Sequence, residues 1–349
     1  MKLVRLLQFL VLAALVAVTP LRTAFAEEVI TDTFGNTIKL QEGDVDSGGI
    51  KIHYYTVGKG PLLFISHGNG DFWGGWGNQL QMLSQRYQVV LYDVRNFNKS
   101  GKVTGIENNK NAVYEKDLLA LQNHFTNGPA VHIGNDLGGM VLWMYAMNYP
   151  EKVKLLIEMN CIHPRAFIRE LATGEQAKMS WYIQAMIENG KMPSMSAGGG
   201  DTQRGSKEPQ AARASMYVGD TPSIAKLRAE SAKAQGEEGR QGVVDWYRAN
   251  FPAKPYTVGS NAFGSRGVEF PHIKAPTLAI AALADVALHP AGYNDLGQWV
   301  DNSFTLVTWP SNDDPAGGHF MNHVHPKKFN ALIASWLNLQ DADLPPLKP

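Results

Sequence analysis

Short apolar runs alternate with helical stretches along much of the chain, and this alternation restricts the possible folds more than any other feature. Eight runs, at residues 37–40, 50–57, 61–66, 87–93, 129–134, 153–160, 275–282 and 303–309, have the composition of strands. Strands that alternate with helices are joined by right-handed crossovers and form mostly parallel sheets with helices on both faces. The sequence therefore predicts an α/β fold with an eight-stranded, mostly parallel sheet.

The alternation stops for about a hundred residues between the sixth and seventh predicted strands. Residues 163–270 have a helical and loop-like composition, which predicts a helical cap (lid) inserted into a core made of residues 27–162 and 271–349. Within the cap, residues 198–209 are polar and rich in glycine, which is typical of a surface loop.

The N-terminus has the three parts of a secretory signal peptide. Lys2 and Arg5 precede an apolar run at residues 6–18, and small residues precede a cleavage site after Ala26. A membrane anchor is the alternative, but the run is too short to span a bilayer. Residues 1–26 therefore predict a periplasmic or secreted protein with no stable membrane insertion after the signal is removed.

Charge and cysteine content exclude several classes of protein. Lys+Arg and Asp+Glu both number 32, so the formal net charge is zero and no basic tract indicates a nucleic-acid partner. Cys161 is the only cysteine, which excludes an intramolecular disulfide. Its apolar neighbours predict a buried thiol rather than a nucleophile. The oligomeric state stays open.

Three polar groups follow predicted strands, in the order Asp136, Asp285, His319. Because the carboxyl ends of parallel strands meet at one edge of a sheet, these side chains are expected to converge. Asp136 stands in G-N-D-L-G-G, between a strand and a helix, where a sharp strand–nucleophile–helix turn would expose its side chain. The order of a nucleophile, an acid and a histidine is typical of α/β-hydrolases.

Four motifs resemble those of the α/β-hydrolase epoxide hydrolases and haloalkane dehalogenases, whose nucleophile is an aspartate. They are H-G-N-G-D-F-W-G-G-W from His67, L-Y-D-V-R-N-F-N-K-S-G, the turn at Asp136, and G-G-H-F around His319. The resemblance extends from about Gly49 onward and implies an α/β-hydrolase fold in which the cap is the family's lid. The chain departs from the family pattern at Gly70, Asn96, Asn98 and Asn135.

An aspartate nucleophile suits displacement at a saturated carbon, which leaves an alkyl ester on the enzyme. His319 would then activate water to hydrolyse the ester, and Asp285 would orient the imidazole. The backbone N–H groups of Asn69 and Leu137 would form the oxyanion hole. This chemistry uses a small apolar organic substrate and water and calls for no cofactor.

Other interpretations of these residues stay open. Asp136 could cap a helix, and Asn160 or Glu158 could be considered as the acid, although an asparagine cannot carry the charge. His323 and His325 are expected to face solvent or to cap the last helix. A metal site at His319, His323 and His325 is disfavoured because no carboxylate or cysteine has matching spacing.

The leaving group distinguishes the two enzyme classes. Epoxide hydrolases use tyrosine hydroxyls from the lid, and the stretch at Trp246–Tyr247 resembles that part of their lid. Asn69 resembles the halide-binding asparagine of haloalkane dehalogenases, but Leu137 stands where those enzymes carry tryptophan, so epoxide hydrolysis is preferred and dehalogenation is the alternative. A catalytically silent binding protein is the alternative from another class. Five residues are predicted to contact the leaving group or the substrate: Tyr247, Tyr182, Trp181, Trp73 and His67.

Overall fold

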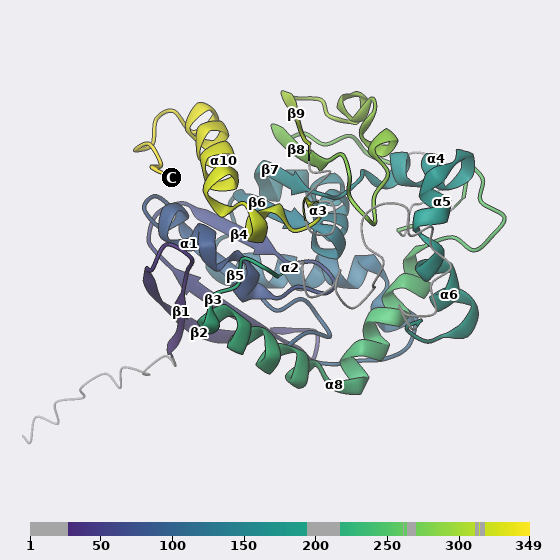
Figure 1. The fold of residues 1–349 in the computed structure, drawn as a ribbon, viewed down its shortest axis with the longest axis horizontal. Coiled ribbons are helices and arrows are strands. Elements are labelled where there is room, and N and C mark those ends of the chain that lie inside the picture. The colour runs from purple at the N-terminus through teal and green to yellow at the C-terminus, as the bar shows by residue number, and fades with distance from the viewer. Residues whose placement is uncertain (1–26, 194–216, 261, 264–269, 311–313, 315–317) are drawn as a thin grey trace, which may run out of the picture.

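A computed structural model describes residues 27–193, 217–260, 262–263, 270–310, 314 and 318–349. Within these ranges, nine strands form one sheet in the order β1-β2-β3-β5-β4-β6-β7-β8-β9 (Figure 1). The strands are β1 (Glu27–Thr31), β2 (Thr37–Ser47), β3 (Ile50–Val57), β4 (Leu62–Ser66), β5 (Gln88–Tyr92), β6 (Ala130–Asn135), β7 (Val153–Met159), β8 (Thr277–Ala282) and β9 (Phe304–Trp309). The first three strands pair antiparallel to their neighbours, whereas β5, β4 and β6 to β9 run parallel.

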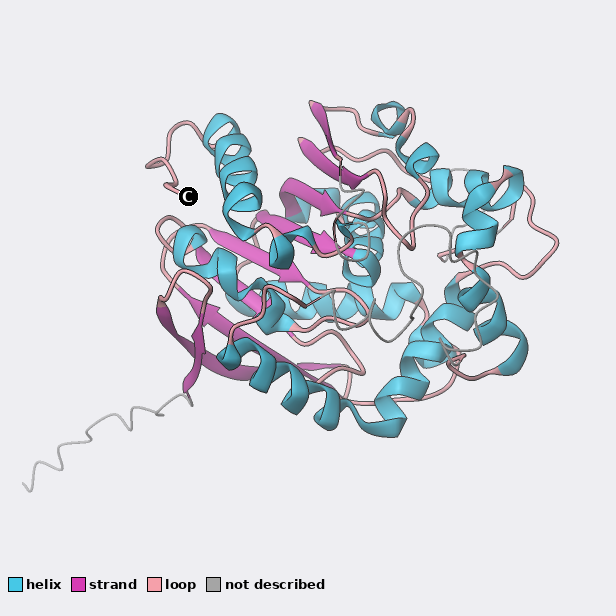
Figure 2. Ribbon diagram, in the orientation of Figure 1, coloured by secondary structure: helices cyan, strands magenta, loops and turns pink. Residues whose placement is uncertain are grey.

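Helices cover both faces of the sheet and also form a separate group at one end (Figures 1 and 2). The α-helices are α1 (Gly77–Leu83), α2 (Asn111–Phe125), α3 (Asp136–Asn148), α4 (Pro164–Thr173), α5 (Glu175–Met179), α6 (Trp181–Asn189), α8 (Pro222–Asn250), α9 (Met321–Val324) and α10 (Pro326–Gln340). Short 3₁₀ turns are η1 (Trp73–Trp76), η2 (Glu107–Asn109), η3 (Pro150–Lys152), η6 (Pro290–Tyr293) and η7 (Leu296–Trp299).

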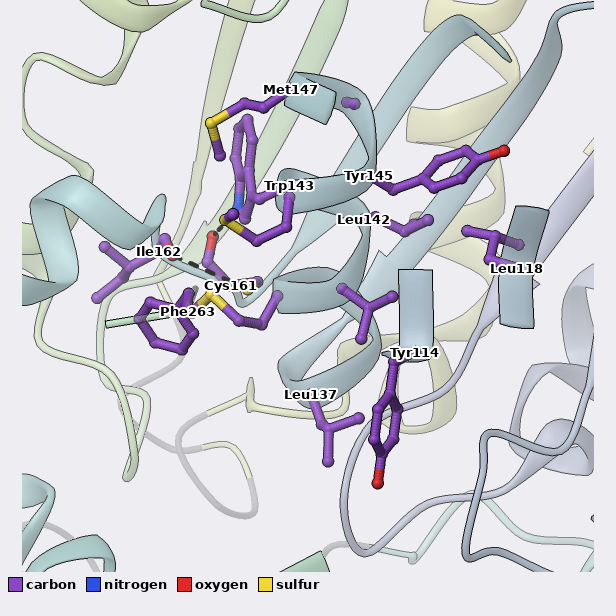
Figure 3. Close-up of a cluster of buried hydrophobic side chains, with 14 of the residues drawn as sticks. Tyr114, Leu118, Leu137, Leu142, Trp143, Tyr145, Met147, Cys161, Ile162 and Phe263 are labelled. Carbon is purple, nitrogen blue, oxygen red and sulfur yellow. Dashed lines mark hydrogen bonds between the residues drawn. The ribbon is translucent and has the colours of Figure 1, made fainter. Parts of the chain in front are cut away.

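The sheet separates two hydrophobic layers because successive side chains of a strand point to opposite faces. Leu63 and Ile65 of β4 belong to the layer beneath α1 and α10, while Phe64 belongs to the layer beneath α2 and α3. Figure 3 shows part of the second layer, where α2 and α3 pack together. α3 carries apolar side chains on all sides between Leu137 and Met147, so it can be buried almost completely.

The predicted α/β architecture is confirmed, but the strand count was one too low. The omitted strand is β1, which pairs with β2 at the edge of the sheet. Its sequence E-E-V-I-T begins with two charged residues and has only one fully buried side chain, so it lacks the apolar run used to find the other strands. All eight predicted strands are present, seven of them within two residues of their expected limits, while β2 continues seven residues beyond its predicted end at residue 40.

The described helices α4, α5, α6 and α8 lie between β7 and β8, where the cap is predicted. α8 is kinked at Gly236, whose φ of 63° and ψ of −169° interrupt the helix. It packs against α6 at the end that contains Tyr247 (Figure 1).

Two predictions concern segments outside the described residues: the signal peptide at residues 1–26 and the loop at residues 198–209. In the part of the chain that the structure describes, no helix is both long enough and apolar enough to cross a membrane. Cys161 is buried, as predicted.

Candidate active site

Asp136 stands at the sharp turn between β6 and α3. Its backbone φ of 49° lies in the left-handed region, which is strained for a residue with a side chain. Asn135 occupies the N-cap position of α3, so Asp136 is not the helix cap. The turn needs glycine at position 138, because a Cβ there would lie 2.5 Å from the carbonyl oxygens of Ser66 and His67. The glycines of G-N-D-L-G-G thus let the turn press against the loop after β4.

His319 connects the two predicted aspartates. Its Nδ1 donates to Asp285 Oδ2 across 2.7 Å, and its Nε2 lies 3.8 Å from Asp136 Oδ2. Asp285 Oδ1 accepts from the backbone N–H groups of Ala287 and Leu288, which fixes the carboxylate in place. The predicted convergence of these three residues is therefore present in the fold.

The other oxygen of Asp136 is held by the backbone. The N–H of Asn69 donates to Asp136 Oδ1 across 2.6 Å, and the N–H of Leu137 also bonds to the carboxylate. Both donors are the ones predicted for the oxyanion hole. The two carboxylate oxygens consequently differ: Oδ1 is bound by an amide, and Oδ2 faces the imidazole.

Burial and charge shift the pKa values of this cluster. Burial raises the pKa of Asp136, although His319 and the N–H groups of Leu137 and Asn69 oppose the rise. Burial alone would lower the pKa of His319, but the charges of Asp285 and Asp136 outweigh it and raise that pKa to about 9. An imidazolium is therefore favoured while Asp136 is ionised.

Asn160 forms hydrogen bonds to the three segments that carry Asp136, Asp285 and His319. Its Nδ2 donates to the carbonyls of Gly318 and His319, and its Oδ1 accepts from the N–H of Ala282 at the end of β8. Its own carbonyl accepts from the N–H of Asp136 at 3.4 Å. Sequence reasoning considered this residue only as an acid and missed its positioning contacts, for which the sequence holds no signal.

Tyr182 on α6 and Tyr247 on α8 bring their rings to the same place from the cap, with centroids 6.0 Å apart and planes at 83°. Burial raises the pKa of both hydroxyls, and the charge of Asp136 raises each further. Both therefore stay protonated near neutral pH and can donate. The side-chain amide of Asn69 donates to the Tyr247 oxygen at 3.4 Å.

Two cavities meet at Asp136, Tyr182 and Tyr247. One, of about 600 Å³, also contains His319 and Asn69 in its wall. The other, of about 30 Å³, is lined mainly by apolar side chains of α3, the cap and the segments after β7 and β8. The carboxylate, the imidazole and the two hydroxyls thus face space in which a small organic molecule could react.

The sequence pattern of the alpha/beta hydrolase fold matches residues 61–326, which is most of the chain. The chain belongs to the alpha/beta hydrolase fold family. This confirms the resemblance that the four motifs indicated.

Epoxide hydrolase 3 of Xenopus tropicalis is 25% identical over 293 residues, which cover 83% of this hydrolase-fold chain and 75% of that protein. The AB hydrolase superfamily protein YfhM of Bacillus subtilis (strain 168) is 37% identical over 123 residues, 34% of this chain and 43% of that protein. Matches to YfhM and to three epoxide hydrolases from Caenorhabditis elegans, Mus musculus and Homo sapiens span less than half the length of each of those relatives.

Among solved structures, an epoxide hydrolase of Bacillus megaterium in complex with an inhibitor has a TM-score of 0.68 to this hydrolase-fold chain. Its sequence is 22% identical, and the match covers 85% of this chain and all of that one. The likeness shows the fold.

Of the three other residues predicted to contact the substrate, only one lines either of the two described cavities. Trp181 is half-buried and lines the large cavity. Trp73 instead lies in the core, stacked on Tyr55 with ring centroids 4.1 Å apart, and His67 is buried beneath its loop. Neither of these two lines the described cavities, which corrects the prediction that they contact the substrate.

His67 instead braces the loop that carries Asn69. Its Nε2 accepts from the N–H of Val94, and its Nδ1–H donates to the carbonyl of Gly68. Burial lowers the pKa of His67, which favours this neutral form. In the same loop Gly70 has a φ of 79°, which proline cannot adopt, so the loop departs here from the H-G-x-P path. Asn96 and Asn98 also have positive φ, as expected for asparagines that replace glycines.

The prediction that His323 faces solvent or caps the last helix is wrong. This histidine is fully buried, with Nε2 3.3 Å from Asp71 and Nδ1 3.3 Å from Asp220. Arg228 of α8 binds the same two aspartates, at 3.0 Å and 2.7 Å. These four residues, here called the ionic cluster, join α8 to the loop after Asn69 and to α9. His325 occupies the N-cap position of α10, but its side chain makes no capping hydrogen bond and bonds to Asp314 instead.

The ionic cluster was not predicted because its members are far apart in the sequence and follow no shared motif.

A metal site at His319, His323 and His325 was the alternative interpretation of these histidines. Across the described ranges, the structure contains no group of three or more His, Cys, Asp or Glu side chains arranged to hold a metal ion.

Proposed function

We propose that this hydrolase-fold chain is an epoxide hydrolase that works through an alkyl ester on Asp136. The observation that carries the proposal is the asymmetry of the Asp136 carboxylate. Oδ1 is held by the N–H of Asn69, and Oδ2 lies 3.8 Å from His319 Nε2, beside a cavity lined by two tyrosines. The epoxide hydrolases among its relatives support the same class of reaction.

In the first step, Asp136 Oδ2 attacks one carbon of the epoxide, and the bond between that carbon and the ring oxygen breaks. The oxygen takes a proton from Tyr247 or Tyr182, the two hydroxyls that face the cavity. Oδ1 becomes the carbonyl oxygen of the new ester and keeps its amide donors. The mechanism therefore requires no rotation of the Asp136 carboxylate: Oδ1 stays at its amide donors, and Oδ2 already faces the cavity.

In the second step, His319 takes a proton from water, and the hydroxide adds to the carbonyl carbon of the ester. Esterification has removed the charge of Asp136, which is one of the charges that raise the pKa of His319. The pKa therefore falls, the imidazolium releases its proton to solvent, and the neutral imidazole that can accept a proton from water becomes available. His319 regains a proton from solvent once Asp136 is ionised again.

The tetrahedral intermediate places its negative oxygen at the N–H groups of Asn69 and Leu137. Its collapse breaks the bond to Oδ2, and His319 returns its proton to the departing oxygen, which releases the diol. The remaining proton on the carboxyl group restores the tyrosine. Epoxide and water are consumed; the oxygen of the water stays on Asp136, and the original Oδ2 leaves in the diol.

The test is a short incubation of the His319→Gln variant with a panel of epoxides and haloalkanes, followed by mass spectrometry of the peptide that contains Asp136. We expect a mass increase equal to the whole epoxide, since ring opening expels nothing. The wild-type protein should form the diol and, in ¹⁸O-water, acquire label on Asp136. The Asp136→Ala variant is the control and should form no adduct.

Other results would favour the alternatives. An adduct with haloalkanes alone, lighter than the added reagent by the hydrogen halide, would indicate dehalogenation. An unlabelled peptide with every compound would indicate a silent binding protein.

We also propose that the chain is exported and cleaved after Ala26, on the basis of its N-terminal pattern. The mass of the protein recovered from a periplasmic extract or culture medium tests this. We expect a chain that begins at Glu27. Full-length protein in the cytoplasm or membrane fraction would contradict the proposal.

A further inference from the structure

The two cavities at Asp136 differ greatly in size. The larger has a volume of about 600 Å³ and the smaller about 30 Å³. One water-sized group needs on the order of 10–15 Å³ by such a measure, so the smaller cavity admits roughly two small groups. A substituent on one side of the reacting carbon therefore has little room, whereas one on the other side has ample room.

The walls of the small cavity are parts of the packed core and of the cap that rests on it. Leu137 and Met140 of α3 and Ile162 after β7 are nearly or completely buried. Leu288 closes another side, and its backbone N–H is held by Asp285. Packed interiors resist insertion of even single methylene groups, so this cavity is expected to stay small when a ligand binds.

The large cavity follows one face of α8 away from the tyrosines. Tyr247, Val243 and Arg240 line it at spacings of four and three residues, which is one face of a helix. Beyond the kink at Gly236, Ser231 and Arg228 continue the wall. A helix rises about 1.5 Å per residue, so this wall extends for roughly 20 Å or more.

The wall of the large cavity carries both apolar and polar side chains. Aromatic and aliphatic side chains, including Phe97, Val286 and Phe320, contribute to it together with Tyr247. Polar groups are spread along α8, with Arg240 on one side of Gly236 and Gln235, Ser231 and the ion pair of Arg228 with Asp71 on the other. The cavity therefore offers room for a long chain but no separate polar end.

Taken together, the geometry points to a substrate class within the proposed function, on which this inference rests. The preferred substrate is a terminal epoxide on a long chain. The unsubstituted end of the epoxide occupies the small cavity, and the chain extends along α8. An epoxide in the middle of a long chain would force a bulky substituent into the small cavity.

The test uses two isomers of dodecane epoxide, one with the ring at the end of the chain and one with the ring at its centre. Both have the same mass and similar hydrophobicity, so kcat/KM for diol formation compares shape directly. We expect the wild-type protein to prefer the terminal isomer by about tenfold or more, since one excess methylene in an apolar pocket is worth about 10–200-fold.

Two variants widen the small cavity independently, Leu288→Ala and Met140→Ala, and each should reduce the preference about tenfold. Val244→Ala is the matched control, because Val244 is buried on α8 and lines neither cavity, and it should keep the wild-type preference. If one of the two widened variants does not fold, the other still tests the inference.

Equal rates for the two isomers, or a preference unchanged in both widened variants, would overturn this inference and leave the proposed function intact. Diol formation from neither isomer, with no adduct in His319→Gln, would overturn the proposed function itself.

Discussion

The core side and the cap side of the cavity are positioned by different kinds of contact. On the core side, Asp136 and His319 are held through backbone groups and the amide of Asn160. On the cap side, α8 is fastened to the core by side chains at both ends. Arg228 binds Asp71 at one end. At the other end, Asp245 and Asn250 accept from the backbone N–H groups of Gly105 and Asn111.

This difference has a consequence for substitution. Backbone contacts on the core side are part of the fold, so changes there should unfold the protein as well as inactivate it. Side-chain contacts on the cap side can be removed one at a time, so changes there should move or weaken the tyrosines while the sheet stays intact.

The largest expected effect is that of Gly138→Ala on the core side. A Cβ at this position would lie 2.5 Å from two backbone carbonyl oxygens, and neither oxygen can move without distorting β4. We expect a loss of more than about 3 kcal/mol in the free energy of unfolding, together with loss of activity. Urea unfolding followed by circular dichroism measures it.

The matched change on the cap side is Gly259→Ala. A Cβ there would meet nothing within 4 Å, so its effect should stay within about 0.5 kcal/mol. Similar losses in the two variants would show that the core turn is no more constrained than the cap.

The second effect is the pH dependence of stability, which tests the charges of the core side. The pKa of His319 is raised from its ordinary 6.5 to about 9 by Asp285 and Asp136, against the effect of burial. Below pH 6.5 both the folded and the unfolded states carry this proton, and the stabilisation is complete. As the pH rises towards 9, the unfolded state releases the proton first, so about 3 kcal/mol is lost over this window.

Urea unfolding between pH 6 and pH 9.5 measures this loss, with His319→Gln as the comparison. The variant should have the shallower slope. It should keep some slope, because Asp71 and Asp220 raise the pKa of His323 in the same direction despite its burial. Equal slopes would mean that His319 does not carry the charge assigned to it.

The same contrast explains what could be predicted from the sequence. The sheet and the convergence of Asp136, Asp285 and His319 follow from local patterns, because apolar runs define strands and strand order brings their ends together. Asn69 and Leu137 were predictable for the same reason, since their N–H groups are set by the loop and the helix start. Asn160 was not, because its contacts depend on where three separate loops meet.

Contacts that depend on side-chain packing were the ones that sequence reasoning missed or misplaced. Trp73 and His67 belong to a motif near the site, but packing turns the first towards Tyr55 and the second towards Val94. His323 lies four residues after His319, and its charged partners come from two other segments, Asp71 in the loop after β4 and Asp220 just before α8. Such partners come from distant segments and leave no periodic signal.

The third effect concerns the ionic cluster on the cap side. Arg228→Met leaves Asp71 and Asp220 to share His323 as their remaining cationic partner. Uncompensated buried charge is costly, and the remaining histidine offsets part of it, so we expect a loss of about 2 kcal/mol. Arg228 also lowers the pKa of His323, so that pKa should rise in the variant, which an NMR titration would detect.

Lys226→Met is the control for this cluster, because Lys226 is an exposed cation on the same helix, paired only at the surface. It should change the free energy of unfolding by less than about 0.5 kcal/mol. If Arg228→Met were equally mild, the cluster would not be what fastens α8 to the core.

The smallest expected effect is that of removing one hydroxyl on the cap side. Tyr247→Phe removes a donor to the developing oxyanion, and such bonds to charged groups are worth about 1.5–3 kcal/mol. We expect kcat/KM to fall about 10–100-fold with the thermal midpoint nearly unchanged. Tyr182→Phe should act in the same direction but less strongly, because its side chain is less buried and has no bond to Asn69.

The step that slows distinguishes donation from mere packing. Tyrosine acts when the ring oxygen departs, so Tyr247→Phe should slow formation of the ester on Asp136 in a single turnover. Hydrolysis of that ester depends on His319 and the two backbone N–H groups, which the substitution leaves in place, so its rate should be retained. A variant that forms the ester at the wild-type rate but hydrolyses it slowly would move Tyr247 to the water step. In that case Tyr247 of the cap and His319 of the core would both act in hydrolysis of the ester, rather than Tyr247 in its formation and His319 in its hydrolysis.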